Sequence, residues 1–135
     1  KSAQDLSEGG LAVALAESCI HGLDTRSACC AGTGGAAIGC EISVHPIGCG
    51  GNPNHRPDSV LFGEGNSAVV VSFSPQDEAA LSALCEKYNV PFAVVGRVGG
   101  DTLVIKDCLG GEIVRLSTRD MADAWGHGLE RAAKA

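Results

Sequence analysis

Apolar residues at helical spacing predict the first two helices of the chain. Leu11, Leu15 and Cys19 recur at every fourth position, so they share one side of a helix over about residues 9–21. This helix should be half buried. A second helix follows the capping segment 74–77, in which proline takes the first helical position, and Asn89 ends it. Its apolar stripe consists of Ala80, Leu81, Leu84, Cys85 and Tyr88.

A third helix is predicted at the end of the chain. Ser117 and Asp120 are its capping residues, because a serine before the first turn and an acid within it satisfy free backbone amides. Met121, Trp125 and Leu129 lie at four-residue intervals and form its inward stripe. We expect Trp125 to anchor this helix in the core.

Alternating and continuous apolar runs predict the strands. Residues 38–44 alternate apolar and polar side chains, which is typical of a strand with one face in the core. Residues 68–73 form a run that is apolar except for Ser72, which predicts a strand buried on both faces. Residues 90–98 form a further strand, and residues 102–105 pair with 113–116 in a hairpin across two glycines.

The order of these elements indicates the fold class. Residues 45–59 contain three prolines, three glycines and two asparagines, which predicts a long irregular loop. The remaining elements predict an α+β fold in which helices pack on a mixed β-sheet. The strand, helix and strand over residues 68–98 are partly ferredoxin-like.

Size and composition indicate one compact domain over residues 1–135. The chain is 44% hydrophobic, which is enough for a core but short for two domains. Its 19 glycines and five aromatic residues indicate a core of small and β-branched side chains. The chain starts inside a motif and without methionine, so we expect it to be a fragment of a longer enzyme.

Charge and hydropathy exclude two classes of partner. The formal net charge of -6, with only ten scattered basic residues, argues against a nucleic-acid surface. No apolar run approaches the roughly 20 residues that span a membrane, and no signal-like segment is present. We therefore expect a cytoplasmic protein without a nucleic-acid or membrane partner.

The seven cysteines are expected to be reduced core residues. Their number is odd and no Cys-x-x-Cys pair occurs, unlike a disulfide framework or a zinc ribbon. Two alternatives remain open as a small metal-binding or redox module: a redox role of Cys29 and Cys30, or a zinc site of His45, Cys49 and His55 with Cys40 nearby.

A turn near the front of the chain is the strongest candidate site. Asp5, Ser7, Glu8, Gly9 and Gly10 place two acids, a hydroxyl and two glycines where a helix begins. Glycines allow a close approach of the backbone to a ligand, and free amides at a helix start attract phosphate or carboxylate groups. Asp5 and Glu8 can hold a hydrated magnesium ion between them. The alternative is an ordinary helix start capped by Ser7.

A second carboxylate is expected to converge on this turn. Glu64 and Asn66 lie between the polar loop and the apolar run 68–73. Side chains at such a sheet edge can reach a shared cleft. We therefore expect Glu64 and the front turn to line one groove.

The motifs resemble a known enzyme family. Residues 5–17 are similar to the turn and first helix of the second C-type domain in the phosphoribosylformylglycinamidine synthase family. Residues 61–73 resemble its glutamate motif and following strand, residues 94–98 its late strand, and residues 115–132 its closing helix. The resemblance covers nearly the whole chain. Related ATP-using synthetases and maturation factors, including aminoimidazole ribonucleotide (AIR) synthetase and hydrogenase maturation proteins, share this domain and remain the alternative.

The resemblance implies an AIR synthase C-terminal-domain-like fold in an ATP-dependent ligase of purine biosynthesis. In that reaction ATP phosphorylates a formamide oxygen, and ammonia from glutamine displaces the phosphate to give an amidine. The implied partners are the upstream half of the same enzyme and a glutaminase. The implied cofactors are ATP or ADP, with magnesium on Asp5 and Glu64. The expected cofactor-binding residues are Asp5, Ser7, Glu8, Gly9, Gly10, Glu64 and Asn66.

Departures from the family pattern limit the role of this domain. Gly65 and Asn66 stand where the substrate-binding version has Ser-Gln, and Ala68 stands where many relatives have Arg. The four histidines lie outside the family's catalytic histidine motif. We therefore expect no catalytic residue here, an auxiliary nucleotide or phosphate site together with a packing role, and an isolated chain that is inactive.

Overall fold

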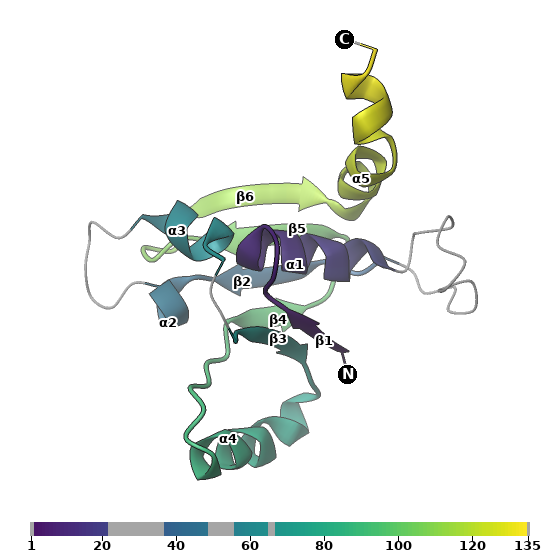
Figure 1. The fold of residues 1–135 in the computed structure, drawn as a ribbon. Coiled ribbons are helices and arrows are strands. Elements are labelled where there is room, and N and C mark those ends of the chain that lie inside the picture. The colour runs from purple at the N-terminus through teal and green to yellow at the C-terminus, as the bar shows by residue number, and fades with distance from the viewer. Residues whose placement is uncertain (1, 22–36, 49–55, 65–66, 135) are drawn as a thin grey trace.

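The computed structural model describes residues 2–21, 37–48, 56–64 and 67–134 (Figure 1). Its strands form an antiparallel two-stranded ribbon and a four-stranded sheet. The ribbon pairs β1 (Ser2–Asp5) with β3 (Val69–Ser72). The sheet has the order β4 (Gly96–Val98), β2 (Cys40–Ser43), β5 (Thr102–Lys106) and β6 (Glu112–Ser117). Because β2 is parallel to β5 while the other pairs are antiparallel, the sheet is mixed, as predicted.

Within the described ranges, five α-helices accompany these strands. They are α1 (Gly10–Ile20), α2 (His45–Gly48), α3 (Pro57–Phe62), α4 (Glu78–Lys87), which follows a 3-10 turn (Pro75–Asp77), and α5 (Thr118–Ala132). Figure 1 shows α1 lying along the four-stranded sheet, whereas α4 and the end of α5 project away from it in opposite directions. In the described part of the chain, no helix has the length and apolar character needed to cross a membrane.

The core lies between α1 and one face of the four-stranded sheet. The period of two along a strand sends alternate side chains of β2 and β5 to this face, where they meet the stripe of α1. The buried cluster contains Leu11, Leu15, Cys19 and Ile20 of α1, Cys40 and Ile42 of β2, and Leu103 and Ile105 of β5, together with Val44, Leu61 and Met121. The helix predicted over residues 9–21 is therefore confirmed, including its buried stripe.

The opposite face of the same sheet carries ion pairs. Glu41 of β2 pairs with Lys106 of β5, and the Arg115 Nε atom lies 2.6 Å from Glu112 Oε1 on β6. Lys106 and Arg115 lower the pKa of Glu41 and Glu112, respectively, through these hydrogen bonds. The predicted hairpin is confirmed as β5 and β6.

Part of the predicted 45–59 loop is helical. α2 and α3 occupy its two ends, and residues 49–55 lie outside the described residues. In α3, Pro57 takes the first helical position, where its missing amide hydrogen costs nothing. The backbone amide of Gly63 donates to the Ser59 carbonyl at 3.1 Å and closes the last turn. Proline therefore starts a helix here, where the sequence analysis expected an irregular segment.

The predicted burial of the 68–73 strand on both faces is wrong. β3 pairs with β1, a strand that the sequence analysis did not predict, and Val69 is 59% exposed. Val71 is also exposed, because a two-stranded ribbon has no second layer on this face. The strand predicted over residues 90–98 is reduced to β4. β3 and β4, which α4 connects, lie in different sheets.

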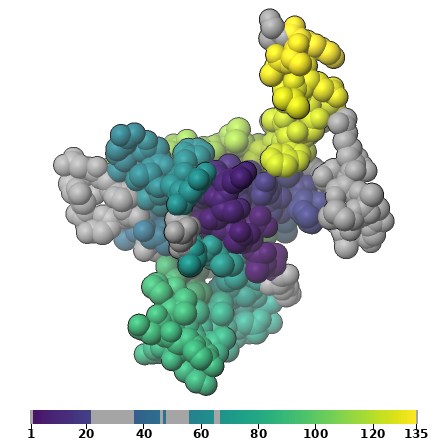
Figure 2. Space-filling view, in the orientation of Figure 1, coloured from purple at the N-terminus to yellow at the C-terminus, as the bar shows by residue number. Residues whose placement is uncertain are grey.

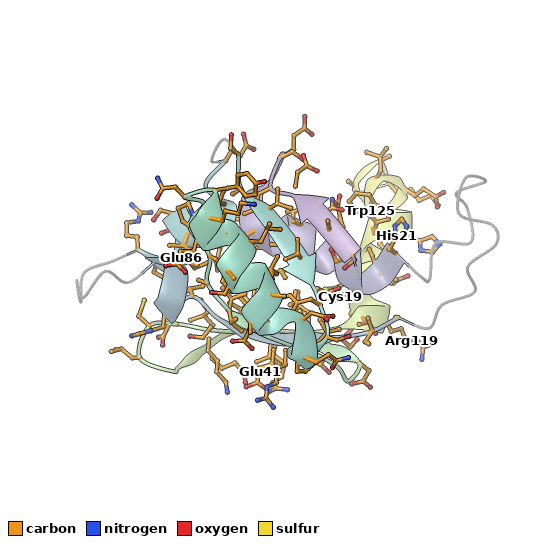
Figure 3. The ribbon with its side chains drawn as sticks, turned by 90° about the horizontal axis from the view of Figure 1, so that it is seen from below. Cys19, His21, Glu41, Glu86, Arg119 and Trp125 are labelled. Atoms are coloured by element: carbon orange, nitrogen blue, oxygen red, sulfur yellow. The ribbon has the colours of Figure 1, made fainter. Side chains whose placement is uncertain are left out.

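The expected core role of Trp125 is also wrong. The Ser117 side chain caps α5 as predicted, accepting a hydrogen bond from the Asp120 amide at 3.0 Å. Met121 in the next turn is buried, but Trp125 is 62% exposed and Leu129 is more exposed still (Figure 3). The start of α5 meets the core, and the helix then extends beyond the sheet, so its apolar stripe continues without a covering layer.

Candidate functional site

The front turn and Glu64 meet in space, although 55 residues separate Gly9 from Glu64. The backbone amide of Gly9 donates a hydrogen bond to Glu64 Oε1 at 3.1 Å. This contact confirms the predicted convergence of the two segments. It joins the start of α1 to the segment that follows α3.

Two local features position this contact. The ladder of β1 and β3 continues into the turn, where the Leu6 amide donates to the Ala68 carbonyl at 2.9 Å. Gly10 has a φ of 66°, and a Cβ atom there would lie 2.9 Å from the carbonyl oxygens of both Leu61 and Gly63. Glycine is therefore required at this position for its backbone conformation and for the close approach of α3.

The turn is not capped by Ser7. Gly9 is the N-cap residue of α1, with a φ of 79°, and no side chain caps the helix. Ser7 contributes its carbonyl oxygen, which accepts from the Gly10 amide at 3.4 Å. The Glu64 carboxylate instead provides a negative charge at the positive end of the helix dipole. An acidic group from another segment thus occupies the position where the capping hydroxyl was expected.

The other candidate residues lie close to Gly9 or to Glu64 in the sequence. Asp5 is the last residue of β1 and pairs with Val69, and Ser7 and Glu8 are exposed in the turn. Asn66 lies outside the described residues. The Gln4 side chain donates to Glu17 Oε2 on α1 at 3.3 Å, which adds another carboxylate near the ribbon.

The carboxylates at this turn fit magnesium in chemical type. Asp5, Glu8 and Glu64 are exposed, and magnesium prefers one or two carboxylates and takes its other ligands from water or phosphate. Among the described residues, no group of three or more His, Cys, Asp or Glu side chains is arranged to hold a metal ion. The turn therefore provides carboxylates for a hydrated ion and does not form a closed protein cage.

The alternative zinc and redox sites gain no support from the described residues. Cys40 lies buried in the core, away from solvent, and His45 begins α2 with an exposed side chain. The remaining members of both sets, Cys29, Cys30, Cys49 and His55, lie outside the described residues. Cys19, Cys40 and Cys85 are free thiols as expected, whereas Cys108 is disulfide-bonded, so the expectation of reduced cysteines is wrong there.

A hollow beside the ribbon was not predicted from the sequence. An open, mainly apolar cavity of about 410 Å³ separates the ribbon from α4; it is lined by Ser2, Ala3, Val71, Ser72, Phe73 and Leu81. In the space-filling view α4 stands apart from the main body (Figure 2). The apolar stripe of α4 was visible in the sequence, but nothing in it indicated that the stripe would remain uncovered.

Comparisons with known proteins point to one group of enzymes. The family "AIR synthase related protein, C-terminal domain" matches residues 1–107. The phosphoribosylformylglycinamidine synthase subunit PurL of Anaeromyxobacter dehalogenans is 38% identical over 130 residues, covering 95% of this chain and 15% of that protein. The same subunit from Thermomicrobium roseum is 34% identical over 132 residues, covering 98% of this chain and 15% of that protein.

A solved structure agrees at the level of the fold. T. maritima PurL complexed with ATP matches with a TM-score of 0.66 and 19% sequence identity, over 90% of this chain and 18% of that chain. This chain thus spans about 15% of the length of the curated relatives named above. The α+β fold with a mixed sheet agrees with the fold predicted from the sequence.

Proposed function

Since the chain belongs to the family of AIR synthase related proteins, as their C-terminal domain, we propose that it is the C-terminal domain of an ATP-dependent phosphoribosylformylglycinamidine synthase. Relatives with that name are similar to it over almost its whole length. The domain, over residues 1–135, contributes an auxiliary nucleotide or phosphate site and a packing surface. The whole enzyme is an amidine-forming ligase of purine biosynthesis.

The contact between Gly9 and Glu64 carries the proposal of a phosphate site. It places a carboxylate at the start of α1, where the helix dipole and backbone amides favour a negative charge. A phosphate group at the same turn would be repelled by Glu64 and Asp5 unless a cation lies between them. Magnesium, when bound, neutralises the phosphate and carboxylate charges and allows both at one turn.

We assign the residues of this turn to binding and orienting a metal ion and a phosphate group, and not to proton transfer. Asp5 and Glu64 hold the metal, Ser7 and Glu8 contribute polar groups, and the two glycines let phosphate oxygens approach the backbone. Asn66, which lies outside the described residues, stays a proposed member of the set. No catalytic residue is assigned to this chain. The upstream half of the enzyme carries out the ATP-dependent step, so the isolated chain is inactive.

Uncovered apolar side chains support a packing role. Four large apolar side chains are more than half exposed: Leu84 on α4, Tyr88 at its C-cap, and Trp125 and Leu129 on α5. Large exposed apolar groups at helical spacing are typical of surfaces that another part of a protein covers. We assign this covering part to the rest of the synthase, with a glutaminase partner that supplies ammonia and a cytoplasmic location for the whole enzyme.

Calorimetric titration of the purified chain with ADP tests the phosphate site. We expect saturable binding that requires magnesium. Glu64→Ala should weaken it at least tenfold, because the metal loses one of its two carboxylates. Glu86→Ala is the matched control, because it removes an exposed carboxylate of α4 (Figure 3) and should leave the affinity unchanged. Equal affinities in wild type and Glu64→Ala, or no binding by wild type, would contradict the assigned site.

A further inference from the structure

Two buried thiols face each other at the junction of α1 and the four-stranded sheet. Cys19 lies in the last turn of α1, and Cys40 is the first residue of β2. Their Sγ atoms are 3.7 Å apart, and both cysteines are free. The exposed fractions of the two residues are only 4% and 5%. Neither thiol belongs to the proposed phosphate site, and the synthase chemistry assigns no role to either.

The surrounding structure fixes this arrangement. Cys40 shares the inner face of the sheet with Leu103, its partner in the β2 and β5 register. The Cys19 carbonyl accepts a hydrogen bond from the Ile38 amide at 3.2 Å, which ties the end of α1 to the segment that enters β2. At 3.7 Å the sulfurs are in van der Waals contact, and a shift of less than 2 Å brings them to the roughly 2.05 Å of a disulfide bond.

We propose that Cys19 and Cys40 are a reversible dithiol and disulfide pair, a modification site that fastens the end of α1 to the sheet when a disulfide oxidant is present. The class of oxidant is a small-molecule disulfide such as glutathione disulfide. Because α1 begins after the Gly9 turn and Cys19 lies in its last turn, the bond restrains the far end of the same helix that carries the phosphate site.

The reaction proceeds by two thiol–disulfide exchanges. The hydrogen bond between the sulfurs lowers the pKa of Cys19, and the same bond together with burial raises the pKa of Cys40, so Cys19 is the first nucleophile. The Cys19 thiolate attacks glutathione disulfide, forms a mixed disulfide and releases one glutathione thiolate. The Cys40 thiolate then attacks the Cys19 sulfur and expels the second. Two electrons pass to the oxidant, and the two protons leave with the two glutathione molecules.

Oxidation should stabilise the chain. The bond closes a loop of about 20 residues, which reduces the conformational freedom of the unfolded chain. For a domain of this size we expect the melting temperature to rise by roughly 5–10 °C on oxidation. Access of the oxidant to the buried thiols requires local opening at the end of α1, so the reaction should be slower than oxidation of the half-buried Cys85.

Peptide mapping and thermal unfolding test this pair in the wild-type chain. The chain is incubated with reduced glutathione or with glutathione disulfide, unfolded in the presence of one alkylating reagent, then reduced and labelled with a second. We expect Cys19 and Cys40 to carry the second label after oxidation and the first label without it. The difference in melting temperature between the two treatments should be several degrees.

Cysteine variants separate this pair from the other thiols. In the Cys19→Ser variant, the rise in melting temperature on oxidation should be smaller than the rise in wild type by roughly 5 °C or more. This comparison does not depend on the stability of the reduced variant. Cys85→Ser is the matched control and should keep the wild-type shift. The proposal is overturned if Cys19 takes the first label after oxidation, or if Cys19→Ser shows the wild-type shift. Neither measurement uses a nucleotide, so its outcome is independent of the proposed phosphate site.

Discussion

The helices α1 and α4 have similar sequences and different surroundings. They contain 11 and 10 residues, and both combine alanine and leucine with a cysteine. α1 buries six residues, whereas α4 buries none, and Leu84 in its stripe is 51% exposed. An apolar stripe therefore specifies a helix with a side to cover, and it does not specify what covers that side.

The difference follows from the strands to which each helix is connected. α1 lies along a four-stranded sheet and also contacts α3 and α5, so its stripe meets a complete layer. α4 follows β3 of the two-stranded ribbon, and the hollow that it shares with Val71 and Phe73 stays open. Packing against tertiary neighbours, and not helix propensity, provides most of the stability of helices of this length.

Truncating one leucine in each helix should give the largest difference in stability between α1 and α4. Leu15→Ala on α1 removes a side chain that is 5% exposed, so we expect the free energy of unfolding to fall by about 3 kcal/mol. Leu84→Ala on α4 is the matched change at an exposed site and should cost less than about 1 kcal/mol. Urea denaturation measures both. Equal losses would show that the chain in solution covers α4 as fully as α1.

A methyl group at the start of α1 should have the next largest effect. Gly10→Ala forces an unfavourable φ and brings Cβ to 2.9 Å from two carbonyl oxygens, so the free energy of unfolding should fall by roughly 2 kcal/mol. Gly110→Ala has a similar φ with open space around it, and should cost about 1 kcal/mol in the same assay. A loss at Gly10 no larger than at Gly110 would argue against the close approach of α3.

Removing a side-chain cap should distinguish the two projecting helices, α4 and α5. Ser117→Ala deletes the acceptor for the Asp120 amide at the start of α5 and should lower the free energy of unfolding by about 1 kcal/mol. The 3-10 turn before α4 has no side-chain cap, so Ser74→Ala should be nearly neutral. Chemical denaturation of the two variants, followed by circular dichroism, gives both values. Similar losses of stability in the two variants would contradict a capping role that only Ser117 has.

The smallest expected effect is on how the stability of the folded chain depends on acidic pH. Arg131 and, more weakly, His127 lower the pKa of Asp123 below its ordinary value of 3.8. A lowered carboxyl pKa stabilises the folded chain above pH 3.8, and this contribution is lost as the pH falls through the folded pKa. Asp123→Asn should therefore flatten the dependence of the urea midpoint on pH below about 4, and added salt should reduce the difference because the pair is exposed.

A variant with an unchanged pH profile would contradict this ion pair in solution. The control is Asp77→Asn in the turn before α4, which should keep the wild-type profile. Together the two profiles show whether charge, and not burial, supports the projecting part of α5.

Local patterns predicted elements whose signals lie within a few residues. The spacing of Leu11, Leu15 and Cys19 correctly gave α1, and the Ser117 cap correctly gave the start of α5. The two glycines between the acids and the apolar run also correctly predicted a turn at the start of α1. The sequence predicted only that Glu64 and the front turn share a groove, and it did not predict the contact between Gly9 and Glu64, because nothing local connects residues 55 positions apart.

Local sequence patterns specified the type of most elements, the acidic glycine turn and the alternation of β2, because backbone preferences and side-chain periodicity act over a few residues. Tertiary structure alone decided that Val69 and Trp125 are exposed, that Cys19 meets Cys40, and that Glu64 takes the place of the expected Ser7 cap. These outcomes depend on which segments of the folded chain lie side by side. The burial of a residue depends on which segments pack against it, and no short stretch of sequence encodes that choice.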